Sequence, residues 1–335
     1  MNGLHLAGSW APRALTDSAV SSGMAFLVGE LEKRDPTLLE PLTSVTWPRD
    51  IVAETGGGFV DFTSNYFVDY ATSGANQYGI VGGQTNVIPI LQANITKDVY
   101  QVFNWANNIK VPYFDEQKMS QVGRSLDAIF NDGLRLNFDK TLDQNTYLGF
   151  SDYGTTGLLN NANVLTSAAP VGAGGSTYWA DKTAEEILAD VDSLIESTWA
   201  RSQYDLTGMA NHVLINPANF ALINRRIVSN AGNVSILTYL LENNLAKSQG
   251  RDLVIAPSRW CVDAGLPVET GTTASNRMVA YVNDKNRVSM DLPVPLTRAM
   301  TQPDVNQLAY LTAYVAQIGQ VKIKYFSAIE YMDGI

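Results

Sequence analysis

The sequence predicts an α+β protein in which β-rich segments flank one long helix and a separate α/β unit. A β-prone aromatic run at 62–70 precedes two further strand-like segments, 86–95 and 98–111. Apolar residues then recur at spacings of three and four over 119–134, which indicates a helix. Strand-like and helix-like segments alternate over 178–295, and the C-terminal end returns to strands.

The length of 335 residues exceeds what one hydrophobic core usually serves, so we expect two folding units. Only 17% of residues are charged, and uncharged polar residues, 26 Asn among them, make up the difference. Because Lys and Glu are depleted at interfaces, this composition suggests a surface that other chains cover. An ordinary monomer with an Asn- and Thr-rich surface is the alternative.

Charge and composition exclude several classes of protein. The net charge is −10, and no basic cluster exceeds a pair such as Arg225-Arg226, so a sequence-reading nucleic-acid binder is not expected. No stretch approaches about 18 apolar residues, and no polybasic anchor is present, so we expect no membrane attachment. The single Cys261 rules out an intrachain disulfide and a zinc site built on cysteines.

Residues 1 to about 50 predict an extended arm. They lack a sustained hydrophobic period, and four prolines interrupt them: Pro12, Pro36, Pro41 and Pro48. An arm with so few local partners becomes ordered only when it lies on another surface.

The segment between Arg49 and Lys97 predicts an acidic, aromatic hairpin. It contains no Lys or Arg, and its only charges are Asp50, Glu54, Asp61 and Asp69. A two-stranded hairpin is marginal alone in water, so it needs a partner surface. A solvated acidic hairpin is the alternative, against which the aromatic side chains argue.

The middle of the chain carries clear helix signals. A helix is expected from Asp115, as its N-cap, to about Lys140, with positive charge along it at Lys118, Arg124, Arg135 and Lys140. Thr183 with Glu186 forms a capping box, and Asn216 and Ser235 cap two later helices. The strand-like segments 278–282 and 288–292 are expected to pair with each other.

No motif indicates catalysis, a metal site or a cofactor. Gly172–Thr177 lacks the Lys that a phosphate loop needs. Asp190 and Asp192 are expected on a solvated helix face, and His212 and Cys261 as buried structural residues. Near the C-terminus, Lys322 and Lys324 alternate with apolar residues, which predicts a strand with one wet face.

Four segments carry a resemblance to a known family. They are Trp47–Ile51, Leu148–Phe150 running on to Gly157–Asn160, Ile215–Phe220, and Ile323–Tyr331. In this order and spacing the chain resembles the major capsid proteins of tailed bacteriophages, which have the Hong Kong 97 fold, and most closely a branch long described as an uncharacterised phage domain. The likeness covers most of the chain, and each motif is weak alone.

The resemblance implies a domain plan and a role. It assigns an N-terminal arm to 1–55, an extended loop to 56–95, a peripheral domain to 96–149 and 306–335, and an axial domain to 150–305. It implies a structural protein of the virion, not an enzyme, whose copies form hexamers and pentamers of an icosahedral shell in the host bacterial cytoplasm. The partners implied are other copies, portal and scaffolding proteins, a possible decoration or cement protein, and enclosed DNA bound without sequence specificity.

Residues at the inter-subunit contacts follow from charge and aromaticity. Some family members cross-link their shells through a loop Lys, but this loop has none, so a non-covalent shell is expected. We expect the acidic residues Glu54, Asp61 and Asp69 to meet Lys118, Arg124, Arg135 or Lys140 of the next copy. Because exposed ion pairs contribute at most about 1 kcal/mol, aromatic side chains such as Phe62 and Tyr66 should supply most of the contact energy.

Three alternatives stay open on the sequence. An encapsulin-like compartment shell shares the fold but encloses enzymes. A two-domain α/β hydrolytic enzyme would need coupled carboxylates or a nucleophile–base pair. A tail or decoration protein would occur in fewer copies per particle.

Overall fold

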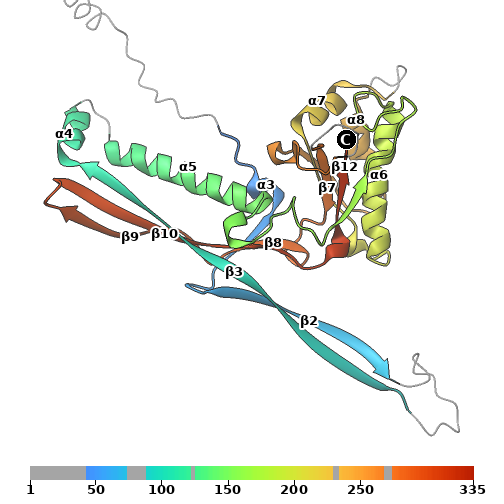
Figure 1. Cartoon of the computed structure of the whole chain (residues 1–335), viewed down its shortest axis with the longest axis horizontal. Helices are drawn as coiled ribbons and strands as arrows, with labels where there is room; N and C mark the ends of the chain where they lie inside the picture. Colours follow the sequence, from blue (N-terminus) through green and yellow to red (C-terminus); the bar gives the residue numbers. More distant parts are fainter. Residues whose placement is uncertain (1–42, 74–87, 122–124, 229–233, 268–273) are drawn as a thin grey trace, which may run out of the picture. The chain divides into compact units, whose positions relative to one another are not determined.

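The computed structural model describes residues 43–73, 88–121, 125–228, 234–267 and 274–335. The chain divides into two units, Met1–Ser44 and Val45–Ile335. Almost all of the first unit lies outside the described residues, and so does most of the predicted arm. The fold is therefore that of the second unit (Figure 1).

The second unit contains both helices and strands, and most of its strands lie in two runs, before α4 and after α9. The described helices are α3 (Trp47–Asp50), α4 (Tyr113–Gln121), α5 (Leu126–Tyr147), α6 (Ala184–Arg201), α7 (Pro217–Arg225), α8 (Ile236–Glu242) and α9 (Leu245–Ser248). The strands are β1 (Val52–Thr55), β2 (Phe62–Ser73), β3 (Ile90–Pro112), β4 (Leu165–Ala168), β5 (His212–Ile215), β6 (Val254–Pro257), β7 (Arg277–Tyr281), β8 (Val288–Leu292), β9 (Val294–Asp304), β10 (Ala309–Gly319), β11 (Val321–Ile323) and β12 (Ile329–Asp333). The strands form three sheets, ordered β1-β8-β11, β2-β3-β10-β9 and β4-β12-β7-β5-β6.

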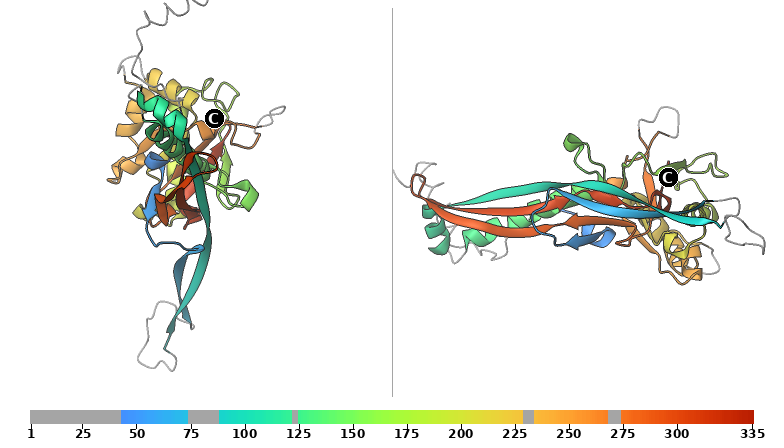
Figure 2. Two further views of the ribbon diagram at one scale, coloured as in Figure 1. Left: turned by 90° about the vertical axis from the view of Figure 1, so that its left-hand side faces the viewer. Right: turned by 90° about the horizontal axis from the view of Figure 1, so that it is seen from below.

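The strand β3 joins two parts of the four-stranded sheet. Its 23 residues span about 76 Å at 3.3 Å per residue. Its first half, 90–101, pairs antiparallel with β2, and its second half, 102–112, pairs with β10. β2 and the first half of β3 thus form a two-stranded hairpin (Figures 1 and 2). The sequence predicted two strands here, but the ladder to β2 continues through Thr96 and Lys97, so β3 is one strand.

The helix α5 covers one face of this sheet. Ser125 caps it, since its hydroxyl accepts a hydrogen bond from the backbone N–H of Ala128, and the helix continues to Tyr147, beyond the predicted end. Leu134 packs on Ile109 and Val111 of β3. The predicted N-cap at Asp115 is wrong: α4 begins directly after β3, so Asp115 lies in its first turn.

The five-stranded sheet forms the main core. Its central strands β5, β7 and β12 are buried along their whole length. Helices α6, α7 and α8 pack on one face, where Val213 and Met278 lie in the same apolar cluster as Ile187. The other face packs on the end of α5 through Tyr147 and Tyr281. The capping residues predicted at Thr183, Asn216 and Ser235 are confirmed.

The predicted pairing of 278–282 with 288–292 is wrong. β7 pairs with β12 and β5, whereas β8 pairs with β1 and β11 in another sheet. The short connection between them therefore passes from one sheet to the next instead of forming a hairpin. Tertiary pairing with strands far away in the sequence overrides the local signal.

Lys322 and Asp190, both predicted on solvent-facing surfaces, are buried instead. Lys322 is 5% exposed, forms an ion pair with Asp291, and has its ammonium 5.5 Å from the ring centre of Tyr100. Asp190 is also buried, and its Oδ2 accepts hydrogen bonds from Lys182 Nζ at 2.5 Å and Trp179 Nε1 at 2.9 Å. Burial raises the pKa of Asp190, and the Lys182 and Trp179 contacts oppose that effect.

We expect Lys182→Met to lower the free energy of unfolding by about 3 to 5 kcal/mol at neutral pH, because it leaves a buried carboxylate unpaired. The double variant Lys182→Met with Asp190→Leu should regain much of that loss, since both charges are then gone. Urea unfolding of the unassembled protein measures both. A double variant no more stable than the single one would contradict this account.

Candidate functional site

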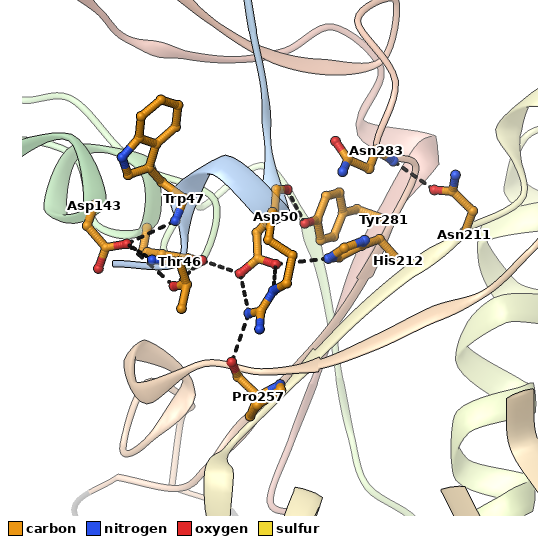
Figure 3. A network of polar contacts seen from close by, with 11 residues as sticks. Thr46, Trp47, Asp50, Asp143, Asn211, His212, Pro257, Tyr281 and Asn283 are labelled. Atoms are coloured by element: carbon orange, nitrogen blue, oxygen red, sulfur yellow. Dashed lines mark hydrogen bonds and ion pairs between the residues drawn. The ribbon is translucent and has the colours of Figure 1, made fainter. Parts of the chain in front are cut away.

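A buried carboxylate of α5 fixes the segment that precedes the hairpin. Asp143 Oδ1 accepts hydrogen bonds from the backbone N–H groups of Thr46, at 2.8 Å, and Trp47, at 3.1 Å. Its Oδ2 accepts from Trp260 Nε1 at 2.7 Å and from Arg259 Nη2 at 3.3 Å. Helix starts leave such N–H groups without helical partners, so Asp143 satisfies the start of α3 (Figure 3).

A second buried carboxylate lies at the end of α3. Asp50 Oδ1 contacts Arg49 Nε at 2.6 Å and His212 Nε2 at 3.1 Å, and Asp50 Oδ2 accepts from Arg49 Nη2 at 2.8 Å. The hydroxyl of Tyr147 also donates to Asp50 Oδ2, and that of Tyr281 donates to its carbonyl oxygen. Four residues, from α3, α5, β5 and β7, thus contact Asp50, which is 0% exposed.

The Asp50 network holds a charge within the core. Burial alone raises the pKa of Asp50, but the hydrogen bonds from Arg49, His212 and Tyr147 outweigh it, and the net pKa is lowered. Arg49 extends the network, because its Nη2 donates to the carbonyl oxygen of Pro257 at 2.9 Å. Residues 46–51, the anchor segment, are therefore tied to α5 and to the five-stranded sheet (Figure 3).

The anchor segment sets where the hairpin begins. β1 follows it directly and pairs in parallel with β8, from Val52 opposite Ser289 to Thr55 opposite Leu292. Gly56, Gly57 and Gly58 then have positive φ angles of 113°, 108° and 75°, which favour glycine. A fixed strand thus passes through a short glycine connection into β2.

The hairpin has one apolar face. In an antiparallel pair, alternate residues and their cross-strand partners share a face. The register places large apolar residues together, and each is between 45% and 72% exposed: Phe62, Tyr66, Val68, Tyr70, Leu91, Ile95 and Val99. We call these seven residues the apolar face. Lys97 lies among them, with its ammonium 5.7 Å from the ring centre of Tyr66.

The opposite face of the hairpin is mostly polar. Its residues include Asn65, Asp69, Gln92, Asn94, Thr96 and Asp98. Phe67, Ile90 and Tyr100 are exceptions, and the ring of Phe67 contacts that of Tyr325 edge-on at 5.7 Å. In the described part of the chain, the hairpin therefore meets the body at its base and leaves the apolar face uncovered. Exposed contiguous apolar surface of this kind marks a contact site for another molecule.

The predicted contact residues do not form one patch. Phe62 and Tyr66 share the apolar face, whereas Asp69 lies on the other face and Asp61 precedes β2. Glu54 lies in β1, with its Oε1 3.8 Å from Lys324 Nζ of the same chain.

The predicted basic residues are spread over α4 and α5. Lys118 Nζ lies 3.6 Å from Asp115, Arg135 is exposed, and Lys140 is half-buried. Arg124 lies outside the described residues. Whether any of these charges meets another copy stays a prediction.

Sequence reasoning missed the role of the anchor segment. His212 is buried as predicted, but its partner Asp50 lies 162 residues away, and Asp143 contacts Thr46 across 97 residues. The Arg49-Asp50 pair directly before an apolar Ile-Val is the only local hint. Cys261 is buried as predicted, and burial raises its pKa to about 12.

The sequence matches a family model over most of its length. The model of the family "Major capsid protein" matches residues 76–335, which is more than three quarters of the chain. The chain belongs to the major capsid protein family. No curated protein sequence is similar enough to count as a match.

Solved structures of capsids share the fold of this capsid protein. The capsid of Myoviridae phage XM1 matches with a TM-score of 0.74 at 16% identity, over 92% of this chain and 98% of that one. The capsid of the native GTA particle matches with a TM-score of 0.62 at 10% identity, over 95% and 99%. A solved structure of Microbacterium phage Oxtober96 matches with a TM-score of 0.59 at 10% identity, over 92% of this chain and 97% of that one. The predicted Hong Kong 97-like fold is confirmed.

The family also confirms the predicted role as a structural protein of a phage capsid shell. Neither the compartment shell nor the hydrolase is favoured by these matches. Across the described ranges, no helix is long and apolar enough to cross a membrane.

Proposed function

We propose that copies of this chain assemble into hexamers and pentamers that close an icosahedral shell around phage DNA in the host cytoplasm. The apolar face of the hairpin carries the proposal, because it is a long contact surface with nothing on it in the described chain. The capsid of the native GTA particle, whose structure shares this fold, also supports the proposal. In a shell, each copy is surrounded by other copies, so the apolar face of every hairpin would be buried against a neighbouring copy.

The domain plan follows from this proposal. Residues 1–55 act as the N-terminal arm and 56–95 as the extended loop. The peripheral domain comprises 96–149 and 306–335, and the axial domain 150–305, with β9 pairing across this boundary to β10, and β12 to β4 and β7. The anchor segment at the end of the arm gives the arm and the loop one fixed origin, through the buried carboxylates of Asp50 and Asp143.

The contact between copies is mainly apolar in this proposal. Phe62 and Tyr66 lie on the same face and can be buried together against one neighbour. Asp69 points the other way, so a charge contact through it needs a different neighbouring surface. Pairs of Glu54, Asp61 or Asp69 with Lys118, Arg124, Arg135 or Lys140 of another copy are a secondary contribution, at most about 1 kcal/mol each while exposed.

Negative-stain electron microscopy of the purified protein, over a range of concentration and salt, tests the proposal. We expect closed shells, or rings of five and six copies, with the yield rising with protein concentration. Portal, scaffolding and cement proteins would then act on the size and completeness of the shell. Small single particles under every condition, also after a co-expressed scaffolding protein is supplied, would contradict it.

A further inference from the structure

A pocket of about 350 Å³ opens beside the root of the hairpin. The side chains that matter for its chemistry are Phe103, Trp105, Thr141, Phe150, Tyr153 and Ile318. The rings of Phe103 and Phe150 lie 5.2 Å apart, and those of Phe103 and Tyr153 lie 5.1 Å apart. No charged residue lines the pocket, so an apolar side chain is the group it suits.

The pocket lies on the same face of β3 as the apolar face of the hairpin. Odd-numbered residues of β3 share that face, from Leu91 through Val99 to Phe103 and on to Val111. The chain's own α5 covers the last part, where Leu134 packs on Ile109 and Val111. The pocket therefore lies at the point where the chain's own cover ends and the bare apolar face begins.

The exposed apolar side chains of α4 are too far away to fill the pocket. Phe114 of α4 is 62% exposed, but α4 follows the far end of β3. From Phe103 to Pro112 the strand runs about 30 Å, at 3.3 Å per residue. Because the pocket continues the bare face directly, one molecule lying along the hairpin reaches both.

We propose that the pocket receives an apolar side chain from a second copy of this chain when the shell forms. The proposal rests on the proposed function, since it assumes that a second copy lies along the hairpin. The pocket then holds this side chain at the base of the hairpin, where the contact between the two copies ends. Large side chains set into such well-packed apolar pockets supply a disproportionate share of binding energy.

Thiol labelling of introduced cysteines tests the proposal. The natural Cys261 is buried and its pKa is raised to about 12, so it contributes little background. Tyr153→Cys reports on the pocket and Tyr70→Cys on the hairpin, and the two tyrosines are 65% and 72% exposed. Thermal melting checks that both variants fold, and labelling in denaturant gives the unprotected rate.

We expect both cysteines to react readily in the unassembled protein and at least about tenfold more slowly in the assembled shell, where reaction requires local opening. Protection of Tyr70→Cys without protection of Tyr153→Cys would overturn the pocket proposal and leave the proposed function standing. Shells in which neither is protected would count against the hairpin contact itself. Slow reaction of Tyr153→Cys before assembly would show that the same chain fills the pocket, which also overturns the proposal.

Discussion

Val68→Glu and Tyr70→Glu should each raise the protein concentration needed for shell formation, by about 30-fold, without unfolding the chain. Both side chains lie on the apolar face and are exposed in the single chain, so unfolding free energies should change by no more than about 0.5 kcal/mol. In the shell, each variant would place an unpaired carboxylate in a desolvated contact and remove an apolar anchor. A loss of about 2 kcal/mol per contact raises the concentration needed for assembly about 30-fold.

Gln92→Glu is the matched control for that prediction. Gln92 neighbours Ala93, the cross-strand partner of Tyr70, but lies on the polar face of the same hairpin. It gains the same charge without facing the neighbouring copy, so assembly should be unchanged. Light scattering across a concentration series measures all three variants. If Gln92→Glu impaired assembly as much as the other two variants, the added net charge, and not the face that carries it, would be the cause.

Asp50→Ala should lower the free energy of unfolding by about 3 to 5 kcal/mol, because it leaves buried His212 and Tyr147 without their shared acceptor. Asp61→Ala is the control. Asp61 is an exposed carboxylate next to β2, and its loss should change stability by less than about 0.5 kcal/mol. Denaturant unfolding of the unassembled protein separates the two. An Asp50→Ala chain as stable as the control would contradict the anchoring role.

The same site predicts a dependence on pH. The pKa of Asp50 is lower in the folded than in the unfolded state, so its ionised form stabilises the fold above the unfolded value of about 3.9. That contribution is lost as the pH falls below this value towards the folded pKa. The stability difference between the wild type and Asp50→Asn should therefore be constant from neutral pH to about pH 5 and shrink below pH 4. A difference that grows in acid would contradict the lowered pKa.

Local signals in the sequence predicted local structure well. Thr183 with Glu186 forms the capping box that its spacing indicates, because both partners lie within one helical turn. The β-prone run from Phe62 indicated a strand, since alternation along a strand needs no distant partner. The absence of Lys and Arg before Lys97 indicated that the hairpin needs a partner, and its uncovered apolar face agrees with that.

Features that depend on distant contacts could not be predicted. Asp190 was expected in solvent because its sequence neighbours on the helix gave no reason for burial, and only the fold brings Lys182 and Trp179 around it. The anchor segment depends on contacts across 96 to 231 residues. Which residues of β2 and β3 lie together on each face also depends on the register between the two strands.

Alternation along β2 explains why the predicted contact residues separate. Successive side chains of a strand point to opposite faces, so Tyr66 and Val68 face one way and Asp69 faces the other. The prediction grouped the acidic and aromatic residues by their charge pattern, without this alternation. The predicted aromatic contact residues therefore lie on one contiguous surface, whereas the predicted acidic residues do not.

Cryo-electron microscopy of the assembled shell tests the central claim most directly. If the apolar face is the contact between copies, the map will show Tyr66, Val68 and Ile95 against a neighbouring chain. Asn94, on the opposite face of the same hairpin, will lie outside that contact. A shell in which the apolar face points into solvent, with the polar face against the neighbour, would contradict the account.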